Sequence, residues 1–249
     1  LKIYPLALVK NTKIYKLYQQ KKFKPYNKKK LLKLLIRAKK IIPRWVRIER
    51  IIRDIPSNEI VEGGSKILNL REIALAEIKK QGLACQCIRC REVKGDYSPQ
   101  EKIFLFRDDY KASKGKEIFL SFENKERTKL FALLRLRLAE LNYPIRANLS
   151  VKLTERLALQ MFPALKGAAI IRDLHTYGQM EQIGRGQTPT QLKTAQHKGL
   201  GKKLIKEAEK IASQEFGFPK IAVIAGIGAR NYYRKLGYRL KETYMVKRI

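Results

Sequence analysis

Gln196-His197-Lys198-Gly199-Leu200-Gly201 opens the part of the chain that decides the fold, and Ala229-Arg230-Asn231-Tyr232-Tyr233-Arg234-Lys235-Leu236-Gly237-Tyr238 completes it. The first stretch has the pattern Q/R-x-x-G-x-G/A between an expected strand and an expected helix. Glycines let backbone N–H groups approach an anion closely, and the N-terminus of a helix carries a partial positive charge. The stretch therefore predicts a loop that binds a pyrophosphate, although a glycine-rich turn before a helix is weak evidence when it stands alone.

The segments around these two stretches predict a mixed α/β or α+β domain. The helix expected from about Gly199 to Phe216 is amphipathic, because its apolar residues recur on one face. Strands come first, and a β-loop-helix-β-helix-β order follows them. The expected strands are 103–110, 117–123, 128–138, 167–177 and 220–225, with one or two more in 238–249, and a short helix is expected over 229–236.

The second stretch resembles the A-x-x-x-Y-x-x-x-G-F/Y block of the GNAT acetyltransferase family, with Ala229, Tyr233, Gly237 and Tyr238 in register. The two motifs also stand in that family's order. The resemblance implies two parallel strands that splay apart, with the pantetheine of acetyl-CoA between them. The residues that it implies for acetyl-CoA binding are Gln196, His197, Lys198, Gly199, Leu200, Gly201, Lys202, Asn231 and Tyr233.

In many GNAT enzymes the tyrosine at the Tyr233 position protonates the leaving CoA thiolate. A phenol suits that role, because its pKa of about 10 lies near the thiol's value of about 8.5. Tyr232 and Tyr233 are the candidate catalytic residues. Adjacent helical residues point about 100° apart, so one can pack in the core while the other faces the ligand. We assign Tyr233 to the ligand; the alternative is that both only pack the helix onto the sheet.

Positive charge dominates the composition and is concentrated at the N-terminal end. The 249 residues carry 55 Lys and Arg against 22 Asp and Glu, a net charge of +33, and residues 1–53 contain a single acid, Glu49. A lysine-rich surface of the hyperthermophile type normally brings matching glutamates, so we favour a nucleic-acid surface. A helix is expected over about Lys28–Ile42, with Asn27 as its N-cap and Pro43 ending it. The candidate contacts are Lys28, Lys29, Lys30, Arg37, Lys39, Lys40, Arg44, Arg47 and Arg50.

The three cysteines, Cys85, Cys87 and Cys90, lie too close together for a disulfide framework. Three clustered thiols favour zinc, which takes four tetrahedral ligands, and an iron–sulfur cluster is the lesser option. His197 falls inside the phosphate loop, so His175 is the candidate fourth ligand. His175 could equally be a core histidine or contact a substrate.

Several further blocks resemble the catalytic-subunit family of Elongator. They are CQCIRCREV, RDLHTYG, QHKGLG with KEAEKIA, AGIGARNYYRKLGY with YMVKRI, and upstream LKIYP, KPY, WVRIERIIRDIP and NLRE. The family combines a radical-SAM module, which uses S-adenosylmethionine and a [4Fe–4S] cluster, with an acetyltransferase. Together they make a 5-carboxymethyl-type modification of the tRNA wobble uridine from acetyl-CoA. The family's cluster-binding cysteine triplet matches no part of this sequence.

We therefore expect the C-terminal part of such an enzyme, lacking most of the radical-SAM module and only partly active. The chain also opens on Leu1 rather than Met. The expected organisation is a radical-SAM tail and basic helical tRNA-binding segment over 1–84, a zinc-binding linker over 85–100, and a GNAT domain over 101–249. No apolar run approaches a membrane span. We expect a cytoplasmic location, with other Elongator subunits or a second copy of the chain as further partners.

The resemblance also implies that tRNA triggers hydrolysis of acetyl-CoA. In this family a long loop, here Gly178–Ala195, can lie over the acetyl-CoA site until tRNA displaces it, so deleting 181–193 should raise tRNA-independent CoA release. Two alternatives stay open. One is a protein lysine acetyltransferase of the histone type, although IRDLHTYG offers Asp173 and His175 but no glutamate base. The other is a non-catalytic tRNA-binding scaffold.

Overall fold

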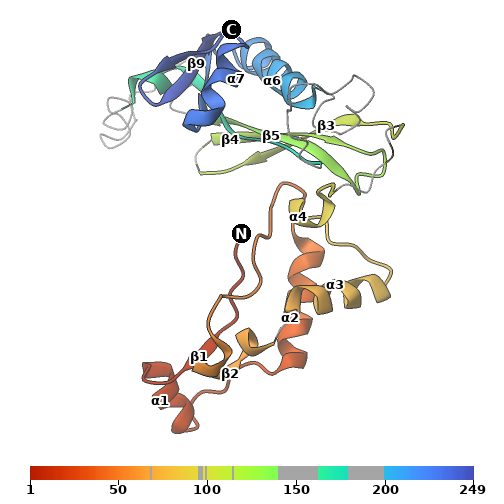
Figure 1. The fold of residues 1–249 in the computed structure, drawn as a ribbon, viewed down its shortest axis with the longest axis vertical. Helices are drawn as coiled ribbons and strands as arrows, with labels where there is room; N and C mark the ends of the chain where they lie inside the picture. The colour runs from red at the N-terminus through yellow and green to blue at the C-terminus, as the bar shows by residue number, and fades with distance from the viewer. Residues whose placement is uncertain (68, 95–97, 99, 114, 140–161, 179–198) are drawn as a thin grey trace, which may run out of the picture. The chain divides into compact units, whose positions relative to one another are not determined.

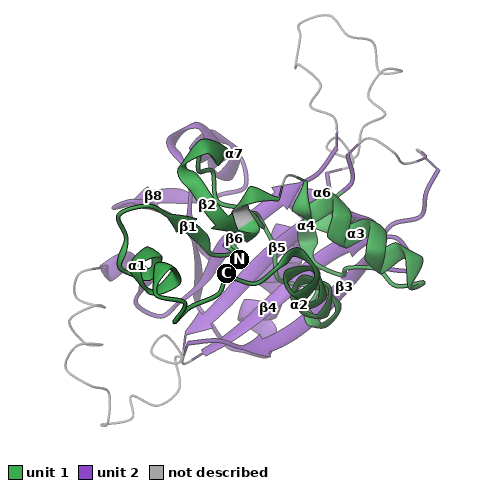
Figure 2. Ribbon diagram, turned by 90° about the horizontal axis from the view of Figure 1, so that it is seen from below, with its two compact units in different colours: residues 1–92 green, residues 93–249 purple. Residues whose placement is uncertain are grey.

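The computed structural model describes the chain apart from residues 68, 95–97, 99, 114, 140–161 and 179–198. The chain divides into two compact units, Leu1–Glu92 and Val93–Ile249, which Figure 2 shows in green and purple.

Unit 1 consists of a two-stranded antiparallel sheet and several helices around one apolar core. Strand β1 pairs with β2. The core includes Leu35 and Ile48, and it extends to Cys85 and Cys87. The elements of this unit are β1 (Ala7–Val9), α1 (Lys13–Gln19), α2 (Lys28–Ile41), the 3₁₀ turns Ser57–Glu59 and Gly64–Lys66, β2 (Ile60–Gly63), α3 (Leu70–Lys80) and α4 (Ile88–Arg91).

The basic helix α2 confirms the helix expected over Lys28–Ile42. The Asn27 side chain accepts a hydrogen bond from the backbone N–H of Lys30 at 2.9 Å, which satisfies one of the free donors at the helix start. One face of α2 is buried, because Leu31 and Leu35 recur at the spacing of a helical turn. The apolar residues at the start of the chain also predict a short strand over Leu1–Leu8, but the structure's first strand, β1, covers only Ala7–Val9.

Unit 2 is built on a seven-stranded sheet in the order β3-β4-β5-β6-β7-β9-β8. Figure 1 shows α6 lying along this sheet, and α6 packs over β4, β5 and β6. The elements are β3 (Phe104–Lys111), β4 (Gly115–Glu123), β5 (Leu130–Ala139), the 3₁₀ turn Pro163–Leu165, β6 (Ala168–Thr176), α6 (Leu200–Lys210), a π-helical turn (Ile211–Glu215), β7 (Lys220–Ile224), the 3₁₀ turn Ile227–Ala229, α7 (Arg230–Arg234), β8 (Arg239–Lys241) and β9 (Tyr244–Arg248). This arrangement confirms the predicted mixed α/β class.

Strands β6 and β7 form the parallel pair of this sheet, and they separate part-way along. The pairing runs from Ala168 opposite Lys220 to Ile171 opposite Val223. β6 nevertheless continues to Thr176, still paired with β5. At the point of separation Arg172 is an extra residue relative to β5, since Ile171 and Asp173 pair with consecutive residues there. A bulge of this kind bends a strand, so it accounts for the opening between β6 and β7 within the described residues.

The core of unit 2 lies between α6 and the sheet. Leu204, Ile205 and Ala208 of α6 are fully or almost fully buried, as are Ile118 and Leu134 of the sheet. The helical periodicity of α6 therefore meets the alternating pattern of the strands. Among the described residues, no helix combines the length and the apolar character that crossing a bilayer requires.

Candidate functional site

A pocket of about 440 Å³ opens where β6 and β7 separate. Its volume lies within the usual range for ligand sites. Three parts of unit 2 contribute to it: the far end of β6, the start of α6, and α7 together with the turn that precedes it. The lining residues are Leu174, Thr176, Gly199, Gly201, Lys202, Ala229, Tyr232 and Tyr233.

The two glycines at the start of α6 are each required there for a different structural reason. Gly199 has φ +65°, in the left-handed region that glycine adopts without strain. Gly201 lies against a tyrosine: a Cβ at this position would be 3.1 Å from the hydroxyl oxygen of Tyr232. The free N–H groups of the first turn of α6 thus border the pocket beside Lys202, an arrangement that suits a phosphate group.

Tyr233 is the buried tyrosine of the pocket. Its ring packs edge-on against the rings of Tyr232 and Tyr238, with centroid distances of 5.3 and 5.7 Å. Burial raises the pKa of Tyr233 to about 12, and the charges of Tyr232 and Asp173 act in the same direction. Burial also raises the pKa of Tyr232. Both phenols therefore stay protonated at neutral pH, as a proton donor must.

The other candidates for acetyl-CoA binding and proton transfer divide into three groups. Gln196, His197 and Lys198 lie outside the described residues, as does most of the loop that follows β6. Asn231 does not line the pocket, and its side-chain oxygen accepts a hydrogen bond from Arg234 at 2.6 Å. Asp173 pairs with Arg135 at 3.5 Å.

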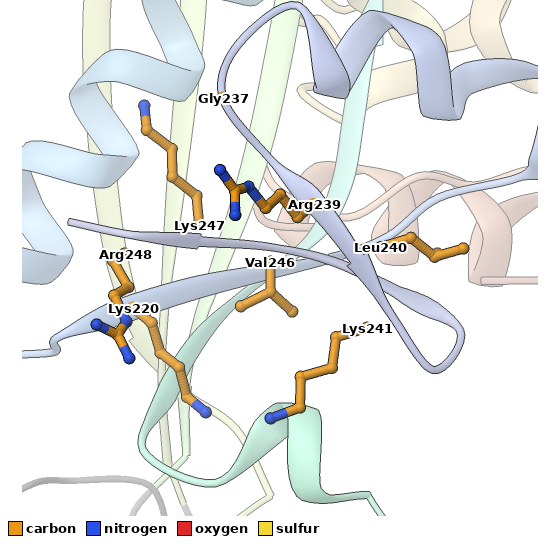
Figure 3. A pocket seen from close by; sticks show the side chains of 8 residues that line it. All are labelled: Lys220, Gly237, Arg239, Leu240, Lys241, Val246, Lys247 and Arg248. Atoms are coloured by element: carbon orange, nitrogen blue, oxygen red, sulfur yellow. The ribbon is translucent and has the colours of Figure 1, made fainter.

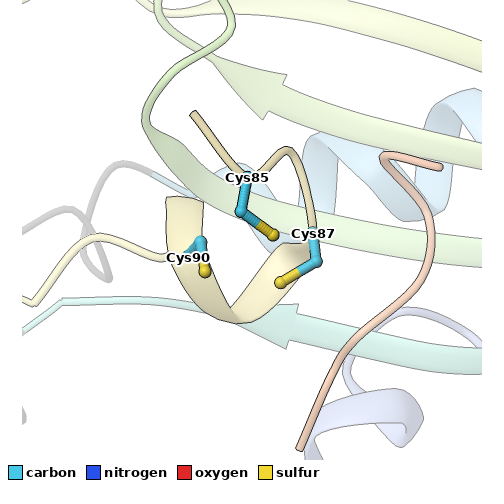
Figure 4. A group of neighbouring side chains, drawn as sticks. All are labelled: Cys85, Cys87 and Cys90. Atoms are coloured by element: carbon cyan, nitrogen blue, oxygen red, sulfur yellow. The ribbon is translucent and has the colours of Figure 1, made fainter. Parts of the chain in front are cut away.

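The three cysteines come together in unit 1, as Figure 4 shows. Their sulfur atoms all lie within 4.8 Å of one another, and Cys85 and Cys87 are buried. Hydrogen bonds from the thiols of Cys85 and then Cys90 lower the pKa of Cys87, because they stabilise its thiolate. Soft sulfur ligands that cluster in this way, with two of the three residues buried, fit a zinc ion. His175 belongs to unit 2, where its ring centroid lies 4.7 Å from that of Tyr177, and its ligand role stays a prediction.

The prediction that Lys39 belongs to the nucleic-acid surface is wrong. Its side chain is fully buried, and its Nζ lies 3.7 Å from the Sγ atoms of both Cys85 and Cys90. A buried ammonium cannot reach a phosphate backbone, so Lys39 leaves the set of candidates. Arg47 is bound to Glu92 at 2.7 Å and Arg50 is bound to Asp54. Arg44 is half-buried, and the exposed candidates are Lys28, Lys29, Lys30, Arg37, Lys40 and the ion-paired Arg50.

A second, strongly basic hollow of about 720 Å³ lies over β7, β9 and β8, and Figure 3 shows the side chains around it. Lys220 stands directly opposite Arg248 in the antiparallel register. Burial lowers the pKa of Lys220, and the nearby charge of Lys241 adds to the effect, while Glu242 opposes it. Like charges facing each other on a sheet are unfavourable, so the hollow favours an anion.

Sequence reasoning missed several residues that matter here. Leu174, Thr176 and Ala229 line the pocket, although the sequence motifs that contain them assigned them no role in the site. The positions of Leu174 and Thr176 follow from the bulge at Arg172, which has no signature in the sequence. The basic hollow was also missed, because β7, β8 and β9 bring together cations that are scattered along the chain.

Comparison with known proteins agrees with this geometry. Residues 1–80 match the Radical_SAM C-terminal domain, and residues 192–238 match the Acetyltransferase (GNAT) family. The tRNA uridine(34) acetyltransferase of Methanocaldococcus infernus is 41% identical over 100% of this chain, and human Elongator complex protein 3 is 40% identical over 99%. The chain is homologous over its whole length to the Elongator complex protein 3 family.

A solved structure of this family also matches the fold. It is the archaeal Methanocaldococcus infernus Elp3 with an N-terminal deletion (1–46), with a TM-score of 0.77 and 40% sequence identity over 100% of this chain. The chain spans 44% and 42% of the lengths of the two curated relatives above, and 55% of that solved chain. The family resemblance expected from the cysteine, phosphate-loop and tyrosine blocks is thereby confirmed.

Proposed function

We propose that this chain carries the acetyltransferase site of a tRNA-modifying enzyme, which takes part in 5-carboxymethyl-type modification of the wobble uridine. The observation that carries the proposal is the pocket beside the part of β6 that extends past its pairing with β7, lined also by the start of α6 and by Tyr232 and Tyr233. The names of the relatives, tRNA uridine(34) acetyltransferase and Elongator complex protein 3, supply the substrate class. A cytoplasmic location and tRNA-triggered hydrolysis of acetyl-CoA belong to the same proposal.

Within this proposal the chain's own residues have three tasks. The N–H groups at the start of α6, together with Lys202, hold the pyrophosphate of acetyl-CoA. The edge of β6 beyond Ile171, which β7 leaves free within the described residues, offers backbone groups to the pantetheine. Tyr233 donates its phenolic proton to the sulfur of the leaving CoA thiolate. S-adenosylmethionine and a [4Fe–4S] cluster would belong to a part of the enzyme whose ligands this sequence lacks.

Release of free thiol from acetyl-CoA tests the proposal. The purified chain is assayed alone, with tRNA and with a lysine-rich peptide. Release that depends on tRNA is expected. Release that depends on the peptide, accompanied by its acetylation, would replace the proposal with a protein lysine acetyltransferase. If acetyl-CoA binds in a titration but no thiol appears under any condition, the chain is a scaffold.

Replacing Gly201 by valine is expected to weaken acetyl-CoA binding by at least about tenfold, roughly 1.4 kcal/mol or more. The new side chain would occupy the space of the Tyr232 hydroxyl, which leaves only 3.1 Å to a Cβ. Isothermal titration with acetyl-CoA measures the change. Gly226→Val is the matched control, because a Cβ at Gly226 meets nothing within 4 Å. Equal affinities for the two variants would contradict the placement of the pocket.

Removing cations from the basic hollow is expected to weaken tRNA binding and reduce its salt dependence. In the test variant, three cations of the hollow are changed to glutamine: Lys220, Lys241 and Arg248. The control variant carries the same change at three lysines that are exposed elsewhere on unit 2: Lys111, Lys206 and Lys210. Because each lost phosphate contact reduces the slope of log K against log salt by about 0.7–0.9, the first variant should lose about two to three units of slope. The control should lose none, and a loss shared equally by both variants would count against a localised contact.

We also propose that Cys85, Cys87 and Cys90 hold a structural zinc ion. The support is the close cluster of their three sulfurs, two of them on buried residues, since three thiolates are a donor set that zinc prefers. When bound, the ion would cross-link the segment after α3 to the core of unit 1. These cysteines have no place in the acetyl-transfer chemistry.

A further inference from the structure

The buried amine of Lys39 has no role in the proposed tRNA surface or in the proposed acetyl-CoA pocket. Lys39 is on the inner face of α2, and none of its side chain reaches solvent. Within the described part of the chain it forms no ion pair with a carboxylate. Burying an unpaired ammonium is costly, so its environment must supply a different kind of partner.

The partners of Lys39 are the sulfurs of the cysteine cluster. Its Nζ lies 3.7 Å from the Sγ of Cys85 and 3.7 Å from the Sγ of Cys90. In a tetrahedral zinc site, a Zn–S bond of about 2.3 Å and a Zn–N bond of about 2.0–2.1 Å place the nitrogen about 3.6 Å from each sulfur. The amine thus stands where a fourth ligand belongs relative to two of the three cysteines.

We propose that Lys39 is the fourth ligand of the zinc site formed by Cys85, Cys87 and Cys90. An ammonium group has no lone pair, so zinc binding releases one proton from Lys39 and one from each cysteine that is still a thiol. These protons go to solvent, and one Zn–N bond and three Zn–S bonds form in their place. The three thiolates and the neutral amine then complete a closed site within unit 1, without a residue from unit 2. This assignment replaces the predicted role of His175.

The assignment gives α2 a second role. The same helix presents Lys28, Lys29 and Lys30 at its exposed N-terminal turn. A bond from Lys39 to the metal fixes the C-terminal part of the helix to the Cys85–Cys90 segment. The metal site would therefore hold in place the helix that carries the exposed cations proposed to contact tRNA.

X-ray absorption at the zinc edge of the full chain is the first test. Three sulfur atoms and one nitrogen, without the outer-shell scattering of an imidazole ring, are expected. An imidazole pattern would overturn the proposal in favour of a histidine. This measurement uses the wild-type protein, so it does not depend on any variant folding.

Competition with a colorimetric zinc chelator is the second test. Lys39→Met and Lys39→Arg should both lower zinc affinity by at least the 10- to 100-fold that loss of an outer-shell partner causes, because neither side chain offers an amine lone pair. Wild-type affinity in Lys39→Arg would overturn the proposal, since arginine keeps the charge and the N–H donors. Lys40→Met, whose lysine is exposed and bound to Gln81 at 2.8 Å, is the matched control and should bind zinc as the wild type does.

His175→Ala separates the remaining possibility. It should keep wild-type zinc affinity, and a loss comparable to that of Lys39→Met would overturn the assignment. The inference rests on the proposal that the three cysteines bind zinc, but the two fail differently. A chain that takes up no zinc would remove both, whereas a zinc site with the same affinity in Lys39→Arg would remove only the role of Lys39.

Discussion

Tyr233→Phe is expected to lower tRNA-dependent thiol release from acetyl-CoA by about 10²- to 10⁴-fold, the usual contribution of a positioned general acid. The phenyl ring keeps the edge-on packing against Tyr232 and Tyr238, so the fold and the pocket should be preserved. Acetyl-CoA affinity should therefore change little. A thiol-reactive dye measures the rate, and a titration on the same sample measures the affinity.

Tyr244→Phe is the matched control for this prediction. Tyr244 lies on β9, where its ring meets Phe162 edge-on at 6.3 Å, and it does not line the pocket. Its variant should turn over like the wild type. Unchanged release in Tyr233→Phe, with acetyl-CoA still bound, would show that another group or water protonates the thiolate. Parallel loss of binding and release would instead make Tyr233 a packing residue, the alternative left open by the sequence.

Cys87→Ser is expected to abolish equimolar zinc binding and to open unit 1 locally. Cys87 is fully buried and belongs to the apolar core that includes Leu70 and Ala74 of α3. Loss of a metal site is among the few single changes that cost on the order of 4–5 kcal/mol. A factor of ten in an equilibrium constant corresponds to 1.4 kcal/mol, so this loss of about 4–5 kcal/mol makes local opening about 10³-fold more frequent. The amide hydrogens of α3 should then exchange about 10³-fold faster.

Hydrogen exchange followed by mass spectrometry separates this effect from general unfolding. Peptides from β4 and β5 of unit 2 should keep their protection in Cys87→Ser, and acetyl-CoA should still bind. Wild-type protein stripped of metal by a chelator should match the variant. A Cys87→Ser protein that retains one zinc per chain, or protection in α3 that does not respond to the metal, would contradict the structural role.

The predicted elements were most accurate where short-range patterns determine the structure. The Asn27 cap, the apolar stripe of α2 and the glycines before α6 are local signals, and each marks its element to within a few residues. The parallel pairing of β6 with β7 followed from the family resemblance, and the register confirms it. The helix expected to run to Phe216 is instead α6 followed by a π-helical turn, Ile211–Glu215.

The features that the sequence did not reveal depend on contacts between distant residues. The charge of Lys39 suggested an exposed surface residue, yet α2 turns it toward cysteines 46 and 51 positions later. The bulge at Arg172 is defined by register against β5 and not by residue type. The position of Tyr232 over Gly201 likewise requires α7 to pack against α6. A single sequence carries no pattern for such pairings.

The sheet of unit 2 also has a consequence for the order in which it can form. β3, β4 and β5 are consecutive antiparallel neighbours joined by short connections, whereas β6 and β7 pair across the whole segment from 177 to 219. Closing a long loop costs more entropy than closing a hairpin, and such contacts tend to form late in folding. The candidate pocket beside α6 lies where this late pairing ends. Acetyl-CoA should therefore slow the unfolding of unit 2 more than it speeds the folding of unit 2. The reason is that the ligand binds a region that is not yet formed when β3, β4 and β5 pair.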